Sequence, residues 1–83
     1  MRLPVIRHIS KFIEKNDDNS ITETLKLLEY IAEARGLKEE ELDVIGELIS
    51  NLYGSLEVQK LTKQGMTQKD ALNTFMKRVS SIG

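Results

Sequence analysis

The sequence contains no cysteine, so the chain can form neither a disulfide framework nor a thiolate metal site, and its redox compartment stays open. Long apolar runs are missing too, because no segment approaches the roughly 18 apolar residues that a membrane-spanning helix needs. The start, from Met1 to Val5, also lacks the continuous apolar stretch of a signal peptide. We therefore expect a cytoplasmic protein that does not contact a membrane.

Motifs of catalysis, metal binding and phosphate binding are also absent. Neither a G-x-G-x-x-G pattern nor a Walker lysine motif occurs. Asp18 to Glu29 has an EF-hand-like spacing of oxygen ligands, but Glu23 stands where the calcium loop needs glycine. His8 is the only histidine, and the sequence gives it no partner for acid–base catalysis. We expect no enzyme, cofactor or metal; the alternative is an enzyme subunit whose polar pocket near His8 is completed by oligomerisation.

The chain is short and its charge is unevenly distributed. A domain of 83 residues buries only a modest core, so its stability depends on regular helices or on a partner subunit. The net charge of -1 combines a balance of +3 over residues 1–13, -8 over 14–57 and +4 over 58–83. This pattern is typical of basic terminal helices that pack beside an acidic middle.

Signals for helix ends divide the chain into four segments. Pro4 suits the first turn of a helix, and Ser20 with Glu23 three residues later forms a capping box. Gly36 and Gly65 stand where helices commonly end in the left-handed conformation. A second capping box starts at Thr67. The predicted helices cover residues 3–15, 21–35, 39–64 and 68–80, and they predict a single all-α domain over residues 1–83.

The third segment is the longest, and we expect the other three to be organised around it. If it is fully helical it extends about 39 Å, whereas helices of 13 to 15 residues reach about 20 Å. Its apolar residues follow the spacing of an amphipathic helix. They are Leu42, Ile45, Leu48, Ile49, Leu52, Tyr53 and Leu56. The shorter helices cannot cover this stripe, so part of it should pack against another chain.

Small residues beside that stripe indicate where the second chain packs. Gly46 and Gly54 each cost about 0.8 to 1 kcal/mol in a helix interior, and a close helix–helix approach would compensate. Together with Ser50 they form a ridge of small residues four apart, next to Tyr53. We expect a homodimer in which the long helices meet around these four residues; the alternative is a monomer whose first and fourth helices together cover the whole stripe. Gly54→Leu should then change the assembly state without unfolding the chain.

Helix–turn–helix patterns favour an alternative, a DNA-associated regulator. Residues 31–50 match such a motif, but Glu39, Glu40 and Glu41 would meet phosphates with like charge. A second match around Gly65 lies among bases, which are a candidate surface for nucleic acid or another protein. These bases are Lys60, Lys63, Lys69, Lys77 and Arg78.

Three segments resemble a family of small, uncharacterised, all-helical bacterial proteins, a domain of unknown function. They are residues 3–8 (LPVIRH), 41–51 (ELDVIGELISN) and 71–76 (ALNTFM). The resemblance covers essentially the whole chain, and it implies a helical fold without any assigned site residue. It also implies an accessory of thiol-redox or stress proteins, because members tend to be encoded beside thioredoxin-like and peroxiredoxin-like proteins. Without cysteine the chain could not perform thiol chemistry itself. We therefore predict a small, non-enzymatic helical module for protein–protein interaction.

Overall fold

The computed structural model describes the backbone of residues 2–82 and the side chains of residues 2–79. It consists of four helices and, over residues 2–82, contains no strand. The helices are α1 (Leu3–Lys15), α2 (Asn19–Ile31), α3 (Glu39–Lys63) and α4 (Gln68–Ile82). The prediction of an all-α domain with one long helix is therefore confirmed.

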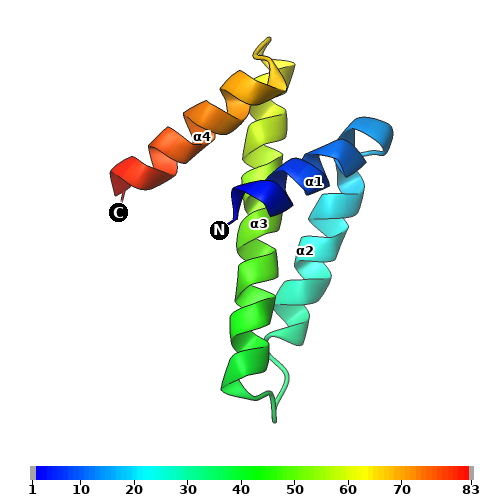
Figure 1. Cartoon of the computed structure of the whole chain (residues 1–83). Coiled ribbons are helices and arrows are strands. Elements are labelled where there is room, and N and C mark those ends of the chain that lie inside the picture. Colours follow the sequence, from blue (N-terminus) through cyan, green and yellow to red (C-terminus); the bar gives the residue numbers. More distant parts are fainter. Residues whose placement is uncertain (1, 83) are drawn as a thin grey trace.

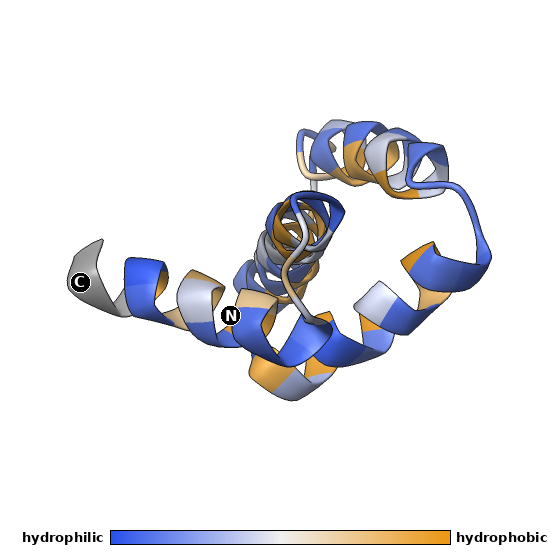
Figure 2. Cartoon of the chain, turned by 90° about the horizontal axis from the view of Figure 1, so that it is seen from above, coloured by the Kyte–Doolittle hydropathy of each residue, from blue (hydrophilic) through white to orange (hydrophobic). Residues whose placement is uncertain are grey.

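Helix α3 is the centre of the molecule and contacts each of the other helices. Figure 1 shows α2 running antiparallel beside α3, while α1 crosses α3. Helix α4 leaves the end of α3 at an angle, and α2 and α4 lie on opposite sides of α3 in both views (Figures 1 and 2). The radius of gyration is 13.6 Å, against about 12 Å for a compact domain of this length. The short helices therefore do not close around α3.

Two clusters of apolar side chains form the core. The first joins α1, α3 and α4 through Ile6, Val58, Leu61, Ala71, Leu72 and Phe75. The second joins α1 and α2 through Ile13, Ile21 and Leu25, with half-buried Ile9, Ile49, Leu52 and Leu56 packed against it. Both clusters lie towards the C-terminal half of α3, where α1 crosses and α4 begins.

The most buried face of α3 is not the predicted apolar stripe. Its buried residues are Asn51, Gly54, Ser55, Val58 and Leu61. Small side chains let α1 and α4 come close here, since a Cβ added at Gly54 would lie 2.9 Å from Ile6 Cδ1 and 3.1 Å from Phe75 Cζ. The expected stripe is only partly covered, because α2 reaches one side of it.

Buried polar groups on this face have partners. Asn51 is buried, and its Oδ1 accepts a hydrogen bond of 2.8 Å from the backbone N–H of Arg2. This bond ties the start of α1 to the middle of α3. The Ser55 hydroxyl donates to the carbonyl of Leu52 at 2.7 Å. Because unsatisfied polar groups are costly to bury, these bonds let α3 bury a polar face.

The predicted ends of the second helix are wrong at both sides. Helix α2 begins at Asn19, because the carboxylate of Asp17 accepts the N–H of Asn19 at 3.0 Å and starts the helix ahead of Ser20. The capping box of Ser20 and Glu23 therefore does not form. The helix ends at Ile31 and is followed by a tight turn. Gly36 does adopt the left-handed conformation, with φ of 84°, but in the later turn before α3.

The predicted ends of α3 are confirmed to within one residue. At its start, the Glu41 carboxylate accepts the backbone N–H of Lys38 at 2.9 Å. At its end, Gly65 has φ of 106°, and the N–H of Met66 donates to the carbonyl of Leu61 at 3.3 Å, as in a Schellman motif. The Thr67 hydroxyl then accepts the N–H of Asp70 at 3.2 Å, which caps α4. Helix α4 continues two residues beyond its expected end, to Ile82.

Candidate functional site

The N-terminal half of α3 keeps much of its apolar surface exposed. Leu42, Val44 and Leu48 are 40%, 59% and 44% exposed, respectively. This half projects beyond α1 and α4 and is flanked along its length by α2 (Figure 1). The expectation that α3 has more apolar surface than its own chain covers is thus confirmed, and the long helix is unbroken at both internal glycines.

One exposed face of α3 holds three of the four residues predicted at an interface. Gly46, Ser50 and Tyr53 are spaced four and three residues apart and share a face, which we call the α3 ridge. A Cβ added at Gly46 would meet nothing within 4 Å, so the ridge is open there. Tyr53 is 50% exposed. Gly54 is not part of this surface, because it is buried under Ile6 and Phe75 of the same chain.

Tyr53 is held in place by α2. Its hydroxyl donates a hydrogen bond of 2.9 Å to Oε1 of Glu29. This bond, together with the negative charge of Glu29, raises the pKa of the Tyr53 hydroxyl above its ordinary value. The hydrogen bond orients the aromatic ring on the α3 ridge towards α2.

A second exposed face of α3 forms an open groove that the sequence did not reveal. Val44 lies two positions before Gly46, and Leu48 lies two positions before Ser50. Both are therefore rotated by about 200° around the helix axis from the α3 ridge. Two depressions of about 450 and 480 Å³ share Val44. Their apolar lining, which we call the α3 groove, is Val5, Ile31, Leu37, Val44, Ile45 and Leu48. Val44 lies outside the predicted stripe, and Val5 joins it only because α1 crosses α3.

Charged side chains line the same two depressions. Four are acids, Glu40, Glu41, Asp43 and Glu47, and one is a base, Arg2. An apolar floor with acidic edges differs from the α3 ridge, which carries glycine, serine and tyrosine. Helix α3 therefore offers two surfaces of different chemistry on opposite sides.

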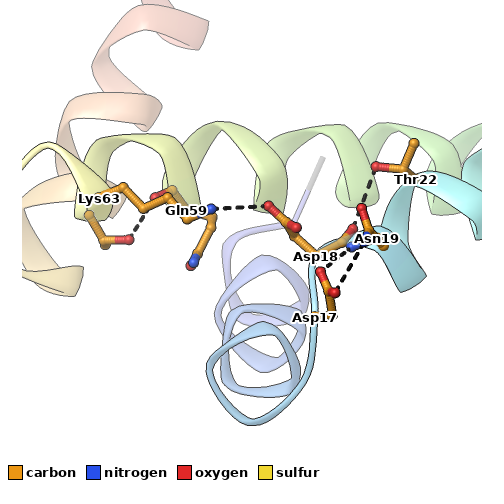
Figure 3. A network of polar contacts seen from close by, with 7 residues as sticks. Asp17, Asp18, Asn19, Thr22, Gln59 and Lys63 are labelled. Carbon is orange, nitrogen blue, oxygen red and sulfur yellow. Dashed lines mark hydrogen bonds and ion pairs between the residues drawn. The ribbon is translucent and has the colours of Figure 1, made fainter.

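The predicted basic residues include one, Lys63, that is paired with an acid of the same chain. The Lys63 ammonium lies 3.2 Å from Oδ2 of Asp18, which ties the end of α3 to the turn between α1 and α2 (Figure 3). A hydrogen bond from Lys63 and a second one involving Asp17 lower the pKa of the Asp18 carboxyl. The remaining four bases are exposed near the end of α3 and along α4: Lys60, Lys69, Lys77 and Arg78.

The surroundings of His8 are basic and open. Its depression is lined by Lys11, Phe12, Lys15 and Asn16 and contains no carboxylate or nucleophile.

Among residues 2–79, no three His, Cys, Asp or Glu side chains are grouped to hold a metal ion. In the stretch with EF-hand-like spacing, Asp18 pairs instead with Lys63. No helix in the described part of the chain is long and apolar enough to cross a bilayer.

The two helix–turn–helix matches differ in geometry. Helices α2 and α3 run antiparallel side by side (Figure 1), whereas DNA-binding motifs cross their helices at about 90 to 120°. The match over residues 31–50 therefore lacks the geometry of a recognition motif. Helices α3 and α4 are joined by the short turn 64–67, with Gly65 at positive φ, and α4 leaves the body at an angle. Only this second pair has the form of a helix–turn–helix.

The fold defines a class: a small all-α protein of four helices, built on one long helix with two uncovered faces. The chain belongs to DUF6952, a family of unknown function whose model matches residues 1–82. The resemblance to a family of uncharacterised helical proteins is confirmed by this match. No curated protein and no solved structure matches the chain.

Proposed function

We propose that this protein is a non-enzymatic interaction module that forms a homodimer through the α3 ridge. The observation that carries the proposal is the uncovered ridge side of α3, where Tyr53 is 50% exposed and Leu42, four positions before Gly46, is 40% exposed. Exposed apolar surface of this kind is typical of an interaction site. The open space at Gly46 lets a second helix approach closely.

The α3 ridge is complementary to itself when two copies run antiparallel. In a two-fold pair centred next to Ser50, Gly46 of each copy stands opposite Tyr53 of the other, so the tyrosine ring fills the space above the glycine. The same register sets Glu39 opposite Lys60, which joins opposite charges at both ends. A parallel pair would instead set each of these groups against itself.

Light scattering after size-exclusion chromatography tests the dimer. We expect twice the chain mass of 9.5 kDa at roughly tens of micromolar protein. Gly46→Gln should give a monomer, because the long side chain blocks close approach while having free space in the single chain. Val44→Gln is the control, since it lies on the opposite face of α3 and should leave the dimer intact. A monomeric wild-type protein would rule out the proposal.

Disulfide cross-linking tests the orientation, because the chain has no cysteine of its own. Gly46→Cys/Tyr53→Cys should cross-link into a dimer under mild oxidation, whereas Tyr53→Cys alone should not. Cross-linking of Tyr53→Cys alone would show that the pair is parallel. The two positions are about 10 Å apart along one helix, so they cannot join within a chain.

We further propose that the module acts in the bacterial cytoplasm as an accessory of thiol-redox or stress proteins. The support is the resemblance of segments 3–8, 41–51 and 71–76, together with the absence of cysteine, which leaves binding and not thiol chemistry as its role. Affinity purification from the native cell should recover thioredoxin-like or peroxiredoxin-like proteins. Recovery of unrelated proteins only would contradict this assignment.

A second candidate function is nucleic-acid binding through α4. It is favoured by the short turn at Gly65, the projecting α4, and the exposed bases Lys69 and Lys77. Fluorescence anisotropy with duplex DNA at low salt tests it, and Lys69→Glu/Lys77→Glu should abolish any binding. Absence of binding by the wild-type protein would exclude this candidate.

A further inference from the structure

We infer that the α3 groove binds a cationic amphipathic helix of a partner protein. The inference rests on the proposed function as an interaction module, but not on the dimer, because the groove and the α3 ridge lie on opposite sides of α3. From Glu40 to Asn51 the two depressions extend about 17 Å along α3, which matches three turns of a docked helix.

The floor of the groove requires an apolar face on the partner. Val44 and Leu48 are 59% and 44% exposed at its centre. Ile31 and Leu37 extend the floor towards the end of α2, and Val5 of α1 closes it at the other end. Amphipathic helices commonly bind such elongated grooves through side chains spaced three and four residues apart.

The edge of the groove determines the charge of that helix. Four acids and one base line the two depressions, so the local field is negative. Lys or Arg side chains beside the apolar face of a docked helix would meet Glu40 and Asp43. Nucleic acids and anionic lipid surfaces carry the same sign as this edge and would be repelled.

The basic helix of a second copy is a poor occupant. Helix α4 has lysines, but its apolar face is already buried against α3 through Ala71, Leu72 and Phe75. Two copies placed groove to groove would bring two acid-lined edges together, which is unfavourable. The geometry therefore points to a helix that another protein supplies.

Fluorescence anisotropy with a labelled synthetic peptide tests this inference. The probe is an amphipathic peptide of leucine and lysine of about 12 residues, sized to the groove. One reference peptide has glutamate in place of lysine, and another has the same composition in scrambled order. At roughly 0.15 M salt, we expect saturable binding of the amphipathic lysine peptide only.

Two pairs of substitutions locate the binding. Val44→Gln/Leu48→Gln should weaken it at least about tenfold by making the floor polar, and both positions are exposed enough to tolerate the change. Glu40→Gln/Asp43→Asn should weaken it and reduce its salt dependence. Glu14→Gln/Glu23→Gln is the matched control, because it removes the same charge from α1 and α2 outside the groove lining. This control should bind like the wild type.

The outcomes separate the inference from the dimer. Gly46→Gln should lose the dimer and still bind the peptide. A wild-type protein that is monomeric and binds the peptide would contradict only the proposed assembly. No binding of the lysine peptide, or equal loss in the groove and control variants, would overturn the groove inference. Binding of the scrambled peptide with the same affinity would also overturn it, since charge alone would then account for the contact.

Discussion

The two glycines inside α3 have opposite roles, although they look alike in the sequence. Gly54 lies where α1 and α4 meet α3, and an added methyl group would be 2.9 Å from Ile6 Cδ1. Ile6 is fully buried, so this methyl group would force its side chain to shift within a packed core. Gly46 has free space around it, so its lack of a side chain only weakens the helix. The sequence prediction that Gly54→Leu leaves the fold intact is therefore replaced by an expectation of unfolding.

We predict that alanine substitutions at these two positions change stability in opposite directions. Gly46→Ala should raise the free energy of unfolding by about 0.5 to 1 kcal/mol through better helix propensity. Gly54→Ala should lower it by about 1 to 2 kcal/mol, because overpacking exceeds the same gain. Urea denaturation followed by circular dichroism measures both, at one low protein concentration. Equal stabilisation by both substitutions would show that Gly54 is not a site of close approach.

The hydrogen bond between Tyr53 and Glu29 predicts a pH dependence. The neutral Tyr53 hydroxyl donates to the carboxylate, so the pKa of Tyr53 is raised in the folded chain. The stabilisation is therefore fully present below the unfolded pKa of about 10 and is lost as the pH rises through the folded pKa. We expect Glu29→Gln to lower the pKa of Tyr53 towards its ordinary value.

Ultraviolet titration of the phenolate in a Tyr30→Phe background measures this change, since Tyr53 is then the only tyrosine. Glu23→Gln serves as the control, because it removes a carboxylate from α2 that does not contact Tyr53. Identical titration curves for Glu29→Gln and the control would mean that the hydrogen bond does not hold Tyr53 in solution.

At the scale of elements, the ends of α3 were predictable because their signals are local. Each signal acts within one or two turns. Glu39, Glu40 and Glu41 lie in the first turn of α3, Gly65 ends α3 at positive φ, and Thr67 caps the following helix α4. The buried face of α3 was not predictable in this way. Asn51 can be buried because its partner, the N–H of Arg2, comes from 49 positions away, and no periodicity of apolar residues marks that contact.

The two candidate surfaces also differ in how far local sequence signals predict them. The α3 ridge was predictable for Gly46, Ser50 and Tyr53, because they share a face of one helix. The burial of Gly54, which excludes it from the α3 ridge, depends on where α1 crosses α3. The presence of the α3 groove depends on the same crossing. The end of α2 was not predictable from a single local signal either. Gly36 was expected to end this helix, but a tight turn after Ile31 ends it earlier.

At the scale of the whole molecule, the helices form an open arrangement with its core at one end. One apolar cluster lies where α1 and α4 meet α3, and the other where α1 and α2 meet α3. The hairpin of α2 and α3 extends away from them. The principal extents of 44, 30 and 17 Å reflect this shape. A chain this short gains stability if a partner covers the extended part.

The proposed dimer therefore predicts that thermal stability depends on protein concentration. A tenfold rise in concentration stabilises a dimer by about 1.4 kcal/mol. The unfolding entropy of two chains of 83 residues is the sum of roughly 2.1 cal/mol/K per residue. Dividing the free-energy change by this entropy gives an increase in Tm of about 4 °C. Differential scanning calorimetry across a hundredfold range measures it. Gly46→Gln should show a constant Tm over that range, and a constant Tm for the wild type as well would mean that the chain unfolds as a monomer.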